Sequence, residues 1–369
     1  MALKILIDAR EAVRNKSGIG VVAREIVSRL HGRCETIEFI VAKPSETRLF
    51  NSKLGRLIEF LWWKIAYIRI LRFKHRCDYV FSLDPINTII GDKCIAIIYD
   101  LIFFVYPQWT NQWGGLWRKL LPYSINKNVL LFSISANTTL DIPRYIPTFN
   151  TNIPIVAIEL GYERAIFNTR NVDRNFLVKY DFPVNLNYIM FVGNAEPRRN
   201  LQSVICALAA CNRALNMEYH LVIAGRNDNH SEQIQEIAAR EGVSDYVHIV
   251  GYLDDLSLAN FYKCALTYIY PSYYEGFGLT VIEAMACGCP VITSNTSSLK
   301  DVAGDAALLV DPADQEQITA ALVRILSDAE LRTHLIQNGY ENIKKYDWDT
   351  MMKTIVTALK GLTTNANHR

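Results

Sequence analysis

The chain has 369 residues, half of them hydrophobic, and a formal net charge of +2. This length favours two domains with a core each, and the near-neutral charge argues against a dedicated nucleic-acid binder. Eight cysteines occur without a Cys-x-x-Cys pair. That pattern favours scattered core thiols in a reducing compartment over a disulfide framework.

Neither a signal peptide nor a transmembrane segment is expected. The first apolar run stops at Asp8, and the longest one, Leu57–Leu71, contains three charged residues. A helix that spans a bilayer needs about 20 apolar residues, so this stretch is too short and too charged. The sequence therefore predicts a cytoplasmic protein, either free or peripheral at the inner face of the membrane.

The first half of the chain predicts an α/β unit. Its apolar runs indicate strands at Leu3–Asp8, Ile37–Ala42, Asp78–Leu83, Cys94–Asp100, Leu130–Ser135 and Ile153–Leu160. A helix is expected from about Val21 to Leu30. The order strand, loop, helix, strand is typical of the start of a doubly wound sheet.

Gly18-Ile19-Gly20, ahead of that helix, formally matches the dinucleotide fingerprint Gly-x-Gly-x-x-Ala, which would end at Ala23. In that fingerprint the first glycine follows the strand almost directly, whereas here a long loop separates Asp8 from Gly18. We favour a glycine turn that lets backbone amides approach a ligand phosphate or an acceptor. A plain helix start stays open as a third interpretation.

Lys53–Arg76 carries seven basic residues against one acidic residue, with aromatic residues interleaved. A helix of this composition could lie on an anionic lipid surface, with its cations among the headgroups and its tryptophans at the interface. Its apolar side chains would cover nearly every face, so a partly buried helix with snorkelling cations is equally compatible.

Asn168–Asn187 is charged and rich in asparagine, and we interpret it as a linker between domains followed by a helix. A second α/β unit is then expected, with strands at Tyr188–Val192, Tyr219–Ala224, Val247–Val250, Ala265–Tyr270, Val291–Thr293 and Ala307–Val310. Its helices are predicted at Leu201–Leu215, Ser231–Glu241, Val281–Ala286, Gln315–Leu326, Ala329–Lys345 and Asp349–Leu359. Two doubly wound units in tandem predict a ligand in the cleft between them.

Glu275 and Glu283 flank a Gly-Phe-Gly turn between the fourth of these strands and the helix that follows it. The free backbone N–H groups at such a helix start can bind a phosphate. Carboxylates beside an anion site are expected to hold hydroxyl groups. Hydroxyl groups next to a phosphate describe a sugar nucleotide.

Arg198 and Arg199 lie in the loop Gly193–Asn200, after a strand and before a helix. Two guanidinium groups there would form a natural clamp for a diphosphate. The alternative is a solvated helix start, although the helix dipole disfavours cations at that end.

Several motifs occur together in this chain. They are Glu275-x7-Glu283 with Pro271-Ser272 before it and Glu-Gly-Phe-Gly inside it, Ala284-Met-Ala-Cys-Gly-Cys-Pro-Val-Ile, Ala303-Gly-Asp-Ala-Ala-Leu-Leu-Val-Asp-Pro, Val192-Gly-Asn-Ala-Glu-Pro-Arg-Arg-Asn, and Ile7-Asp8-Ala-Arg with Gly18-Ile-Gly20. Together they resemble the retaining family 4 glycosyltransferases with the GT-B fold, in particular bacterial mannosyl- and rhamnosyltransferases of surface-polysaccharide synthesis.

This resemblance implies an α/β fold of two Rossmann-like doubly wound domains that face a central cleft. Residues 1–168 would bind the acceptor, residues 169–345 would bind the nucleotide sugar, and a helix in 346–369 would cross back to the N-terminal domain. The reaction would move a hexose, first of all mannose from GDP-mannose, to a glycan or lipid-linked acceptor with retention of configuration. Neither a metal ion nor a cofactor beyond the donor is implied.

The resemblance also implies residue roles. Glu283 would hold the ribose hydroxyls, and Glu275 would hold a hydroxyl of the donor sugar. Arg198 and Arg199 would complete the catalytic set as the phosphate clamp, with Arg199 in the place of the family's usual lysine. The other donor-binding residues would be Gly276, Phe277, Gly278, Leu279, Asn194 and Tyr252. No protein nucleophile is assigned.

On the side of the acceptor, the resemblance implies that Gly18 and Gly20 border the phosphate or the acceptor. Tyr99-Asp100 occupies the place of a His-Asp pair in many relatives. A phenol can still donate a hydrogen bond, but it is not a readily titrated base near neutral pH.

Asp347-Trp-Asp349 is the sole Asp-x-Asp sequence and therefore a candidate for binding Mn²⁺ or Mg²⁺. Its place before the last helix favours N-capping instead. Two rival functions stay open. One is an NAD(P)-dependent oxidoreductase built on Gly18-x-Gly20, and the other is a non-catalytic subunit that binds a sugar nucleotide.

Overall fold

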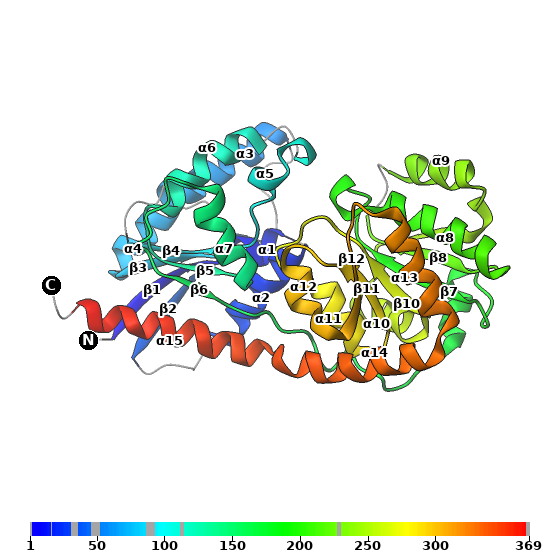
Figure 1. The fold of residues 1–369 in the computed structure, drawn as a ribbon. Coiled ribbons are helices and arrows are strands. Elements are labelled where there is room, and N and C mark those ends of the chain that lie inside the picture. The colour runs from blue at the N-terminus through cyan, green and yellow to red at the C-terminus, as the bar shows by residue number, and fades with distance from the viewer. Residues whose placement is uncertain are drawn as a thin grey trace. The chain divides into compact units, whose positions relative to one another are not determined.

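The computed structural model describes residues 2–15, 17–30, 36–45, 52–85, 93–110, 114–226 and 230–366. The chain forms two compact units. The first comprises Met1–Gly161 and Asp347–Arg369, and the second comprises Tyr162–Tyr346. Each unit contains one six-stranded parallel sheet with helices packed against it (Figure 1). This confirms the predicted doubly wound α/β fold.

The first unit has the strand order β2-β1-β3-β4-β5-β6. Its strands are β1 Leu3–Asp8, β2 Ile37–Ala42, β3 Tyr79–Ser82, β4 Cys94–Ile98, β5 Asn128–Ser133 and β6 Ile155–Ala157. Its α-helices are α1 Arg10–Arg14, α2 Gly18–Arg29, α3 Lys53–Trp62, α4 Ile68–His75, α5 Ile102–Val105, α6 Gly114–Ile125, α7 Ala136–Tyr145 and α15 Trp348–Ala366. Figure 1 shows α3, α4 and α6 on one face of the sheet and α2 and α15 on the other.

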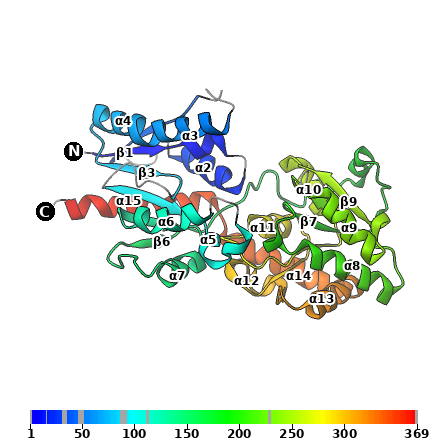
Figure 2. The same cartoon turned by 90° about the horizontal axis from the view of Figure 1, so that it is seen from above.

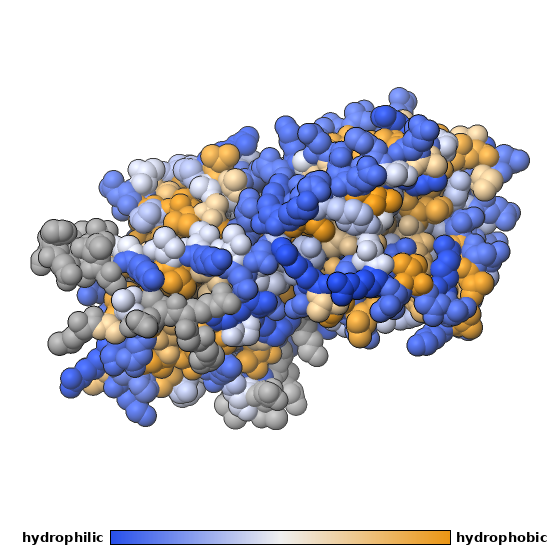
Figure 3. Space-filling model, turned by 90° about the horizontal axis from the view of Figure 1, so that it is seen from below, coloured by the Kyte–Doolittle hydropathy of each residue, from blue (hydrophilic) through white to orange (hydrophobic). Residues whose placement is uncertain are grey.

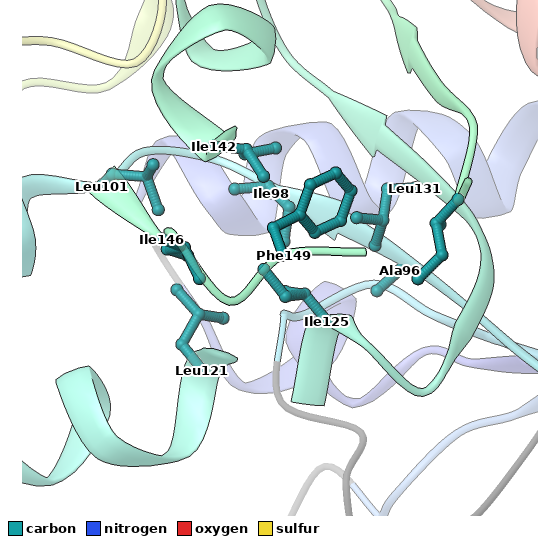
Figure 4. Close-up of a cluster of buried hydrophobic side chains, with 10 residues drawn as sticks. Ala96, Ile98, Leu101, Leu121, Ile125, Leu131, Ile142, Ile146 and Phe149 are labelled. Atoms are coloured by element: carbon teal, nitrogen blue, oxygen red, sulfur yellow. The ribbon is translucent and has the colours of Figure 1, made fainter. Parts of the chain in front are cut away.

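A cluster of buried aliphatic side chains joins the central strands to α6 and α7 (Figure 4). Ile98 of β4 and Leu131 of β5 lie on the sheet side of this cluster, and Leu121 and Ile125 reach it from α6. Ile142 of α7 completes the contact. α6 and α7 therefore pack against the sheet although each of them contains a proline.

Lys53–Arg76 is helical through α3 and α4, which a π-helical turn at Trp63–Tyr67 joins. The extra residue of a π turn shifts the faces of a helix, and Trp63 and Lys64 both become buried. The sequence left a helix on a lipid surface and a partly buried helix open, and Lys64, one of the seven basic residues of this segment, does not face a lipid surface because its side chain is 0% exposed. The side chain of Lys53 lies outside the described residues.

The second unit has the strand order β12-β11-β10-β7-β8-β9. Its strands are β7 Tyr188–Val192, β8 His220–Ala224, β9 Val247–Gly251, β10 Thr267–Tyr270, β11 Val291–Ser294 and β12 Ala307–Val310. Its α-helices are α8 Leu201–Leu215, α9 Ser231–Glu241, α10 Asp255–Cys264, α11 Leu279–Ala286, α12 Ser297–Ala303, α13 Gln315–Ser327 and α14 Ala329–Asn342, and they surround the sheet in Figure 2. The segment interpreted as a linker contains a short 3-10 helix, Arg174–Tyr180.

Aspartates cap several helices of the C-terminal half, as their sequence positions favour. Asp314 accepts a hydrogen bond from the Gln317 N–H at 2.9 Å at the start of α13. Asp347 accepts one from the Thr350 N–H at 2.9 Å at the start of α15, which confirms the N-capping role predicted for Asp347. Among the described residues, no cluster of three or more His, Cys, Asp or Glu side chains could hold a metal ion.

α15 belongs to the first unit, where it packs beside α2. Arg29 of α2 and Asp349 of α15 form an ion pair at 3.3 Å. Gly161, the last residue before the chain leaves this unit, lies directly against the backbone of Trp348, where the chain returns. A Cβ atom at position 161 would collide with that backbone.

Two observations concern hydrophobic side chains and helix length. On the face seen in Figure 3, hydrophobic side chains lie in small groups among hydrophilic ones. Within the described part of the chain, every helix is too short or too polar to cross a bilayer.

Candidate active site

Glu275 lies in the loop that connects β10 to α11 in the second unit. All four residues of β10 are buried, so the strand fixes the start of this loop. Gly278 precedes α11 with a φ of +120°, a conformation that favours glycine because it has no Cβ. The strand, the glycine turn and the helix start therefore follow one another as the sequence predicts.

The other predicted residues of this turn are Gly276, Phe277 and Leu279. Gly276 and Phe277 are buried, and Leu279 opens α11 with a half-buried side chain. The Phe277 ring meets the Tyr346 ring edge to face, with the centroids 5.5 Å apart. Phe277 thus anchors the turn to the end of the second unit.

One oxygen of Glu275, Oε1, attracts several donors. Arg198 Nη1 lies 2.5 Å from it, the Tyr270 hydroxyl 2.6 Å and the Ser272 hydroxyl 3.0 Å. Burial alone would raise the pKa of the Glu275 carboxyl. The charges of Arg198 and Arg199 outweigh burial and hold this pKa below its ordinary value. Glu275 is therefore a carboxylate, which accepts hydrogen bonds and donates none.

Arg198 joins the loop after β7 to the loop after β10. Its Nε lies 2.9 Å from a carboxylate oxygen of Glu196, and its Nη1 also donates to the Tyr274 carbonyl at 3.1 Å. The Arg198 carbonyl accepts from the Tyr273 N–H at 2.7 Å. The guanidinium group of Arg198 is thus used mainly within the protein.

Arg199 is held less completely. Its Nη1 lies 3.4 Å from the Asn194 carbonyl, and its Nε stands 3.8 Å from Glu275 and 3.9 Å from Glu196. This Nε is buried and has no hydrogen-bond partner among the described residues. A buried donor without a partner is unfavourable in the free protein, and an anionic ligand would supply the missing acceptor.

Hydroxyl groups at the start of α12 fasten the Glu275 loop from the other side. The Ser298 hydroxyl lies 2.7 Å from the Glu275 carbonyl and 2.8 Å from the Phe277 carbonyl. The Ser297 hydroxyl accepts from the Glu275 N–H at 3.2 Å, and Ser297 has a φ of +51°. Sequence analysis missed both serines and also Tyr270. The hydroxyl residues among positions 293–298, at the end of a strand and directly after it, were the available signal.

Glu283 lies in α11, and its side chain is half-buried. Burial, with a smaller contribution from Asp255, raises the pKa of Glu283 to about 8. Within the described residues, its carboxyl group has no hydrogen-bond or ion-pair partner. A half-buried carboxyl group without protein donors is suited to a ligand that brings hydroxyl groups.

Asn194 and Tyr252 meet around Arg226 at the carboxyl ends of β7, β8 and β9. The Asn194 side chain accepts from the Arg226 N–H at 3.2 Å. The Arg226 guanidinium lies 5.4 Å from the centre of the Tyr252 ring, which is 63% exposed. This arrangement offers a flat aromatic surface at the edge that carries the arginine loop.

The four predicted residues of the first unit have structural contacts of their own. α2 already begins at Gly18, so the predicted glycine turn before this helix is wrong. Gly20 lies in the first turn of α2 and packs against the Asn15 carbonyl. Tyr99 is buried and donates to the Leu83 carbonyl at 3.0 Å. Asp100 accepts from the Ile102 N–H at 3.1 Å and so helps to begin α5.

A second polar network surrounds Lys64 at the carboxyl ends of β1 and β3. Lys64 Nζ lies 2.5 Å from Asp8, 2.5 Å from Asp84 and 3.0 Å from the Ser82 hydroxyl. Asp8 also accepts from the Trp63 indole N–H at 2.8 Å. The charges of the two carboxylates outweigh burial and keep the pKa of Lys64 above its ordinary value.

Comparison with known proteins identifies relatives along the whole chain. Residues 173–342 match the family described as glycosyl transferases group 1. The chain is similar to O-antigen chain mannosyltransferase B of Escherichia coli, with 33% identity across 93% of this chain and 96% of that protein. It is also similar to O-antigen chain mannosyltransferase RfbU of Salmonella typhimurium, with 26% identity across 83% of this chain and 80% of that protein.

Solved structures share the same fold. One of them is HepE of Anabaena in complex with UDP and glucose, which superposes with a TM-score of 0.75 over 97% of this chain and all of that one. The sequence identity is 15%, so this likeness is one of fold.

Proposed function

The chain belongs to the family of group 1 glycosyl transferases and has the GT-B fold, and we propose that it transfers a mannosyl group from GDP-mannose. The acceptor in this proposal is a glycan or a lipid-linked glycan of surface-polysaccharide synthesis. The names of the two mannosyltransferase relatives support the sugar and the pathway. Glycosyl transfer replaces the oxidoreductase interpretation of Gly18-x-Gly20.

The main support for this proposal is Arg199 Nε, a buried donor without a hydrogen-bond partner among the described residues. Arg199 Nε would donate to a phosphate oxygen of the donor, and Arg198 would add its charge from the Glu275 side. Glu283 would accept hydroxyl groups of the ribose, Glu275 a hydroxyl of the sugar, and Tyr252 would stack on the base. The backbone of the turn from Gly276 to Leu279 would line the phosphates.

In this mechanism the protein acts through charge and position. Departure of the nucleoside diphosphate places negative charge near Arg198 and Arg199 while the sugar becomes oxocarbenium-like. Two guanidinium groups and the start of α11 would stabilise that charge, so the proposal needs no metal ion. The acceptor hydroxyl would attack from the face that the leaving group vacates as the bond to the nucleoside diphosphate breaks, and its proton would pass to a phosphate oxygen of that leaving group, which gives retention without a protein nucleophile.

A thermal-shift assay tests the donor site. GDP is expected to raise the melting temperature in the presence of EDTA, and Glu283→Ala is expected to abolish the shift. Asp305→Ala, a change at an acidic residue elsewhere in the unit, is the matched control and should keep it. UDP and ADP are expected to give smaller shifts than GDP, and NADH none. Unchanged melting with every nucleoside diphosphate would overturn the proposal.

We also propose that the chain works at an anionic membrane surface through the outer face of α3 and α4. Several large apolar side chains of these helices are exposed to solvent, and the most exposed of them, Phe73, is 88% exposed. They are Leu54, Ile58, Trp62, Ile65, Ile70 and Phe73. Next to Phe73, a shallow groove is lined by Arg69, Arg72, Lys74 and Arg76. Cations beside exposed aromatic residues fit anionic headgroups above an apolar interface.

Vesicle co-sedimentation tests this surface. Arg69→Glu combined with Lys74→Glu is expected to weaken binding to vesicles that contain phosphatidylglycerol, because both side chains are exposed. Arg213→Glu combined with Lys300→Glu, an equal charge reversal at exposed positions of the second unit, should bind like the wild type. Equal loss in both double variants would mean that net charge alone drives binding and would contradict a defined surface.

A further inference from the structure

The two oxygens of Glu275 have different surroundings. Arg198, Tyr270 and Ser272 all approach Oε1, whereas no donor in the described part of the chain approaches Oε2. The Glu275 side chain is 16% exposed to solvent. The carboxylate is therefore anchored by one oxygen, and its other oxygen is available to a ligand.

Of the two uncharged donors, Tyr270 is the more specific. The Ser272 hydroxyl lies within 3.0 Å of both Glu275 Oε1 and the Arg198 carbonyl, and its single hydrogen serves one of them at a time. Among the described residues, the Tyr270 hydroxyl has Glu275 as its one acceptor, at 2.6 Å. Tyr270 is thus the neutral residue that fixes which oxygen of Glu275 faces outward.

The ring of Tyr270 is itself held in place. It is buried at the end of β10, with its centroid 5.6 Å from that of Phe191 and 5.8 Å from that of Tyr268. A tyrosine has two side-chain torsions, and close packing on both neighbours limits them. The hydroxyl position therefore follows from the core of the second unit.

We propose that Tyr270 is a positioning residue for the donor sugar. Its hydroxyl holds Glu275 Oε1, so that Oε2 accepts a hydrogen bond from a sugar hydroxyl in the reacting complex. This inference rests on the proposed function, because the sugar comes from the proposed donor. Tyr270 touches neither sugar nor phosphate in this account and acts only through Glu275.

The effect on pH follows from the groups around Glu275. Arg198 and Arg199 lower its pKa, and the Tyr270 hydrogen bond lowers it further. Removal of that hydroxyl leaves both arginines in place and raises the pKa of Glu275. The acid limb of the pH profile should therefore move to higher pH in Tyr270→Phe.

The test compares Tyr270→Phe with Tyr188→Phe. Tyr188 lies on the neighbouring strand β7, is buried, and donates to the Phe261 carbonyl at 2.7 Å, so this control loses a similar buried hydroxyl away from Glu275. The measurements are melting shifts with GDP and with GDP-mannose, and the pH dependence of GDP release from GDP-mannose. GDP alone reports the nucleotide site without the sugar.

Tyr270→Phe is expected to keep the GDP shift and to lose the additional shift that GDP-mannose gives. Its kcat/KM for GDP release should fall at least about tenfold, with the acid limb moved to higher pH. Tyr188→Phe should match the wild type in all of these. If Tyr270→Phe does not fold, Ser272→Ala is expected to show the same changes to a smaller degree.

Two results would overturn the inference. One is a Tyr270→Phe protein with the wild-type pH profile and the full additional shift from GDP-mannose. The other is equal loss in Tyr270→Phe and Tyr188→Phe, which would indicate a structural role. A wild-type protein that no nucleoside diphosphate stabilises would instead contradict the proposed function itself.

Discussion

Two networks of buried charge lie at the carboxyl ends of strands, one in each unit. In the first, Lys64 is fully buried, and its ammonium group has Asp8, Asp84 and Ser82 as acceptors. In the second, Arg199 lies beside Glu275 and Glu196, and its buried Nε has no hydrogen-bond partner among the described residues. The first network is completed by the protein, whereas the second needs atoms that a ligand would bring.

This difference separates stability from binding. A buried ammonium with three acceptors contributes by neutralising two carboxylates, and its loss leaves them without that compensating charge in the interior. Arg199 contributes its charge to Glu275 in the free protein, and its unused donor can also form a strong hydrogen bond to an anion. Substitutions in the two networks should therefore change different measured quantities.

The largest expected effect is on folding. Lys64→Met keeps most of the side-chain volume but removes the buried cation that faces the Asp8 and Asp84 carboxylates, so the free energy of unfolding should fall by about 3–5 kcal/mol. Urea denaturation measures this. Lys353→Met, at an exposed lysine of α15 in the same unit, should change it by less than about 0.5 kcal/mol. A loss below about 1 kcal/mol for Lys64→Met would show that the network is not a stabilising one.

The next effect is on ligand affinity. Arg199→Ala should weaken GDP binding by about 10- to 100-fold, because a hydrogen bond to a charged group contributes about 1.5–3 kcal/mol. The unfolding free energy without ligand should fall less than in Lys64→Met, because Arg199 contributes its charge to Glu275 from 3.8 Å but its Nε has no hydrogen-bond partner to lose among the described residues. Isothermal titration calorimetry measures the GDP affinity of Arg199→Ala, with Arg213→Ala as the control. An Arg199→Ala protein that is destabilised but binds GDP normally would reverse the comparison.

The smallest effect concerns Tyr99. Tyr99→Phe removes the hydrogen bond to the Leu83 carbonyl and should lower the unfolding free energy by about 1 kcal/mol. The melting shifts with GDP and GDP-mannose should not change, because this hydroxyl is already used inside the first unit. A weaker GDP-mannose shift in Tyr99→Phe would instead give Tyr99 a role at the donor sugar.

The second unit was the more predictable one. Its strands β7 and β12 and its helices α8 and α9 have the predicted bounds. In the first unit β1 and β2 also have the predicted bounds, but α6 and α7 were not predicted; each contains a proline, Pro122 or Pro143, and tertiary packing nevertheless supports it. Local sequence signals such as proline therefore predict secondary structure only where tertiary packing does not override them.

The same limit applies to the site. Glu275 and Arg198 were singled out from separate motifs, and the structure brings them to 2.5 Å. Ser298 is 23 residues from Glu275 in sequence, and its contact depends on how β11 pairs with β10. Lys64 is buried within a π-helical turn, which the residue pattern of the segment did not predict. Residue chemistry was predictable, but contacts between distant segments and a change of helix phase were not.

The second unit is inserted into the sequence of the first, and the two ends of the insertion are marked by Gly161 and Trp348, which lie against each other. The chain leaves and re-enters the first unit at neighbouring backbone positions, and α15 then completes that unit beside α2. A short loop from Gly161 to Asp347 would therefore join the two parts of the first unit without moving α15. Each unit could then be produced as one continuous polypeptide, and a chain cut at 346 would remove a helix from the first unit rather than a tail from the second.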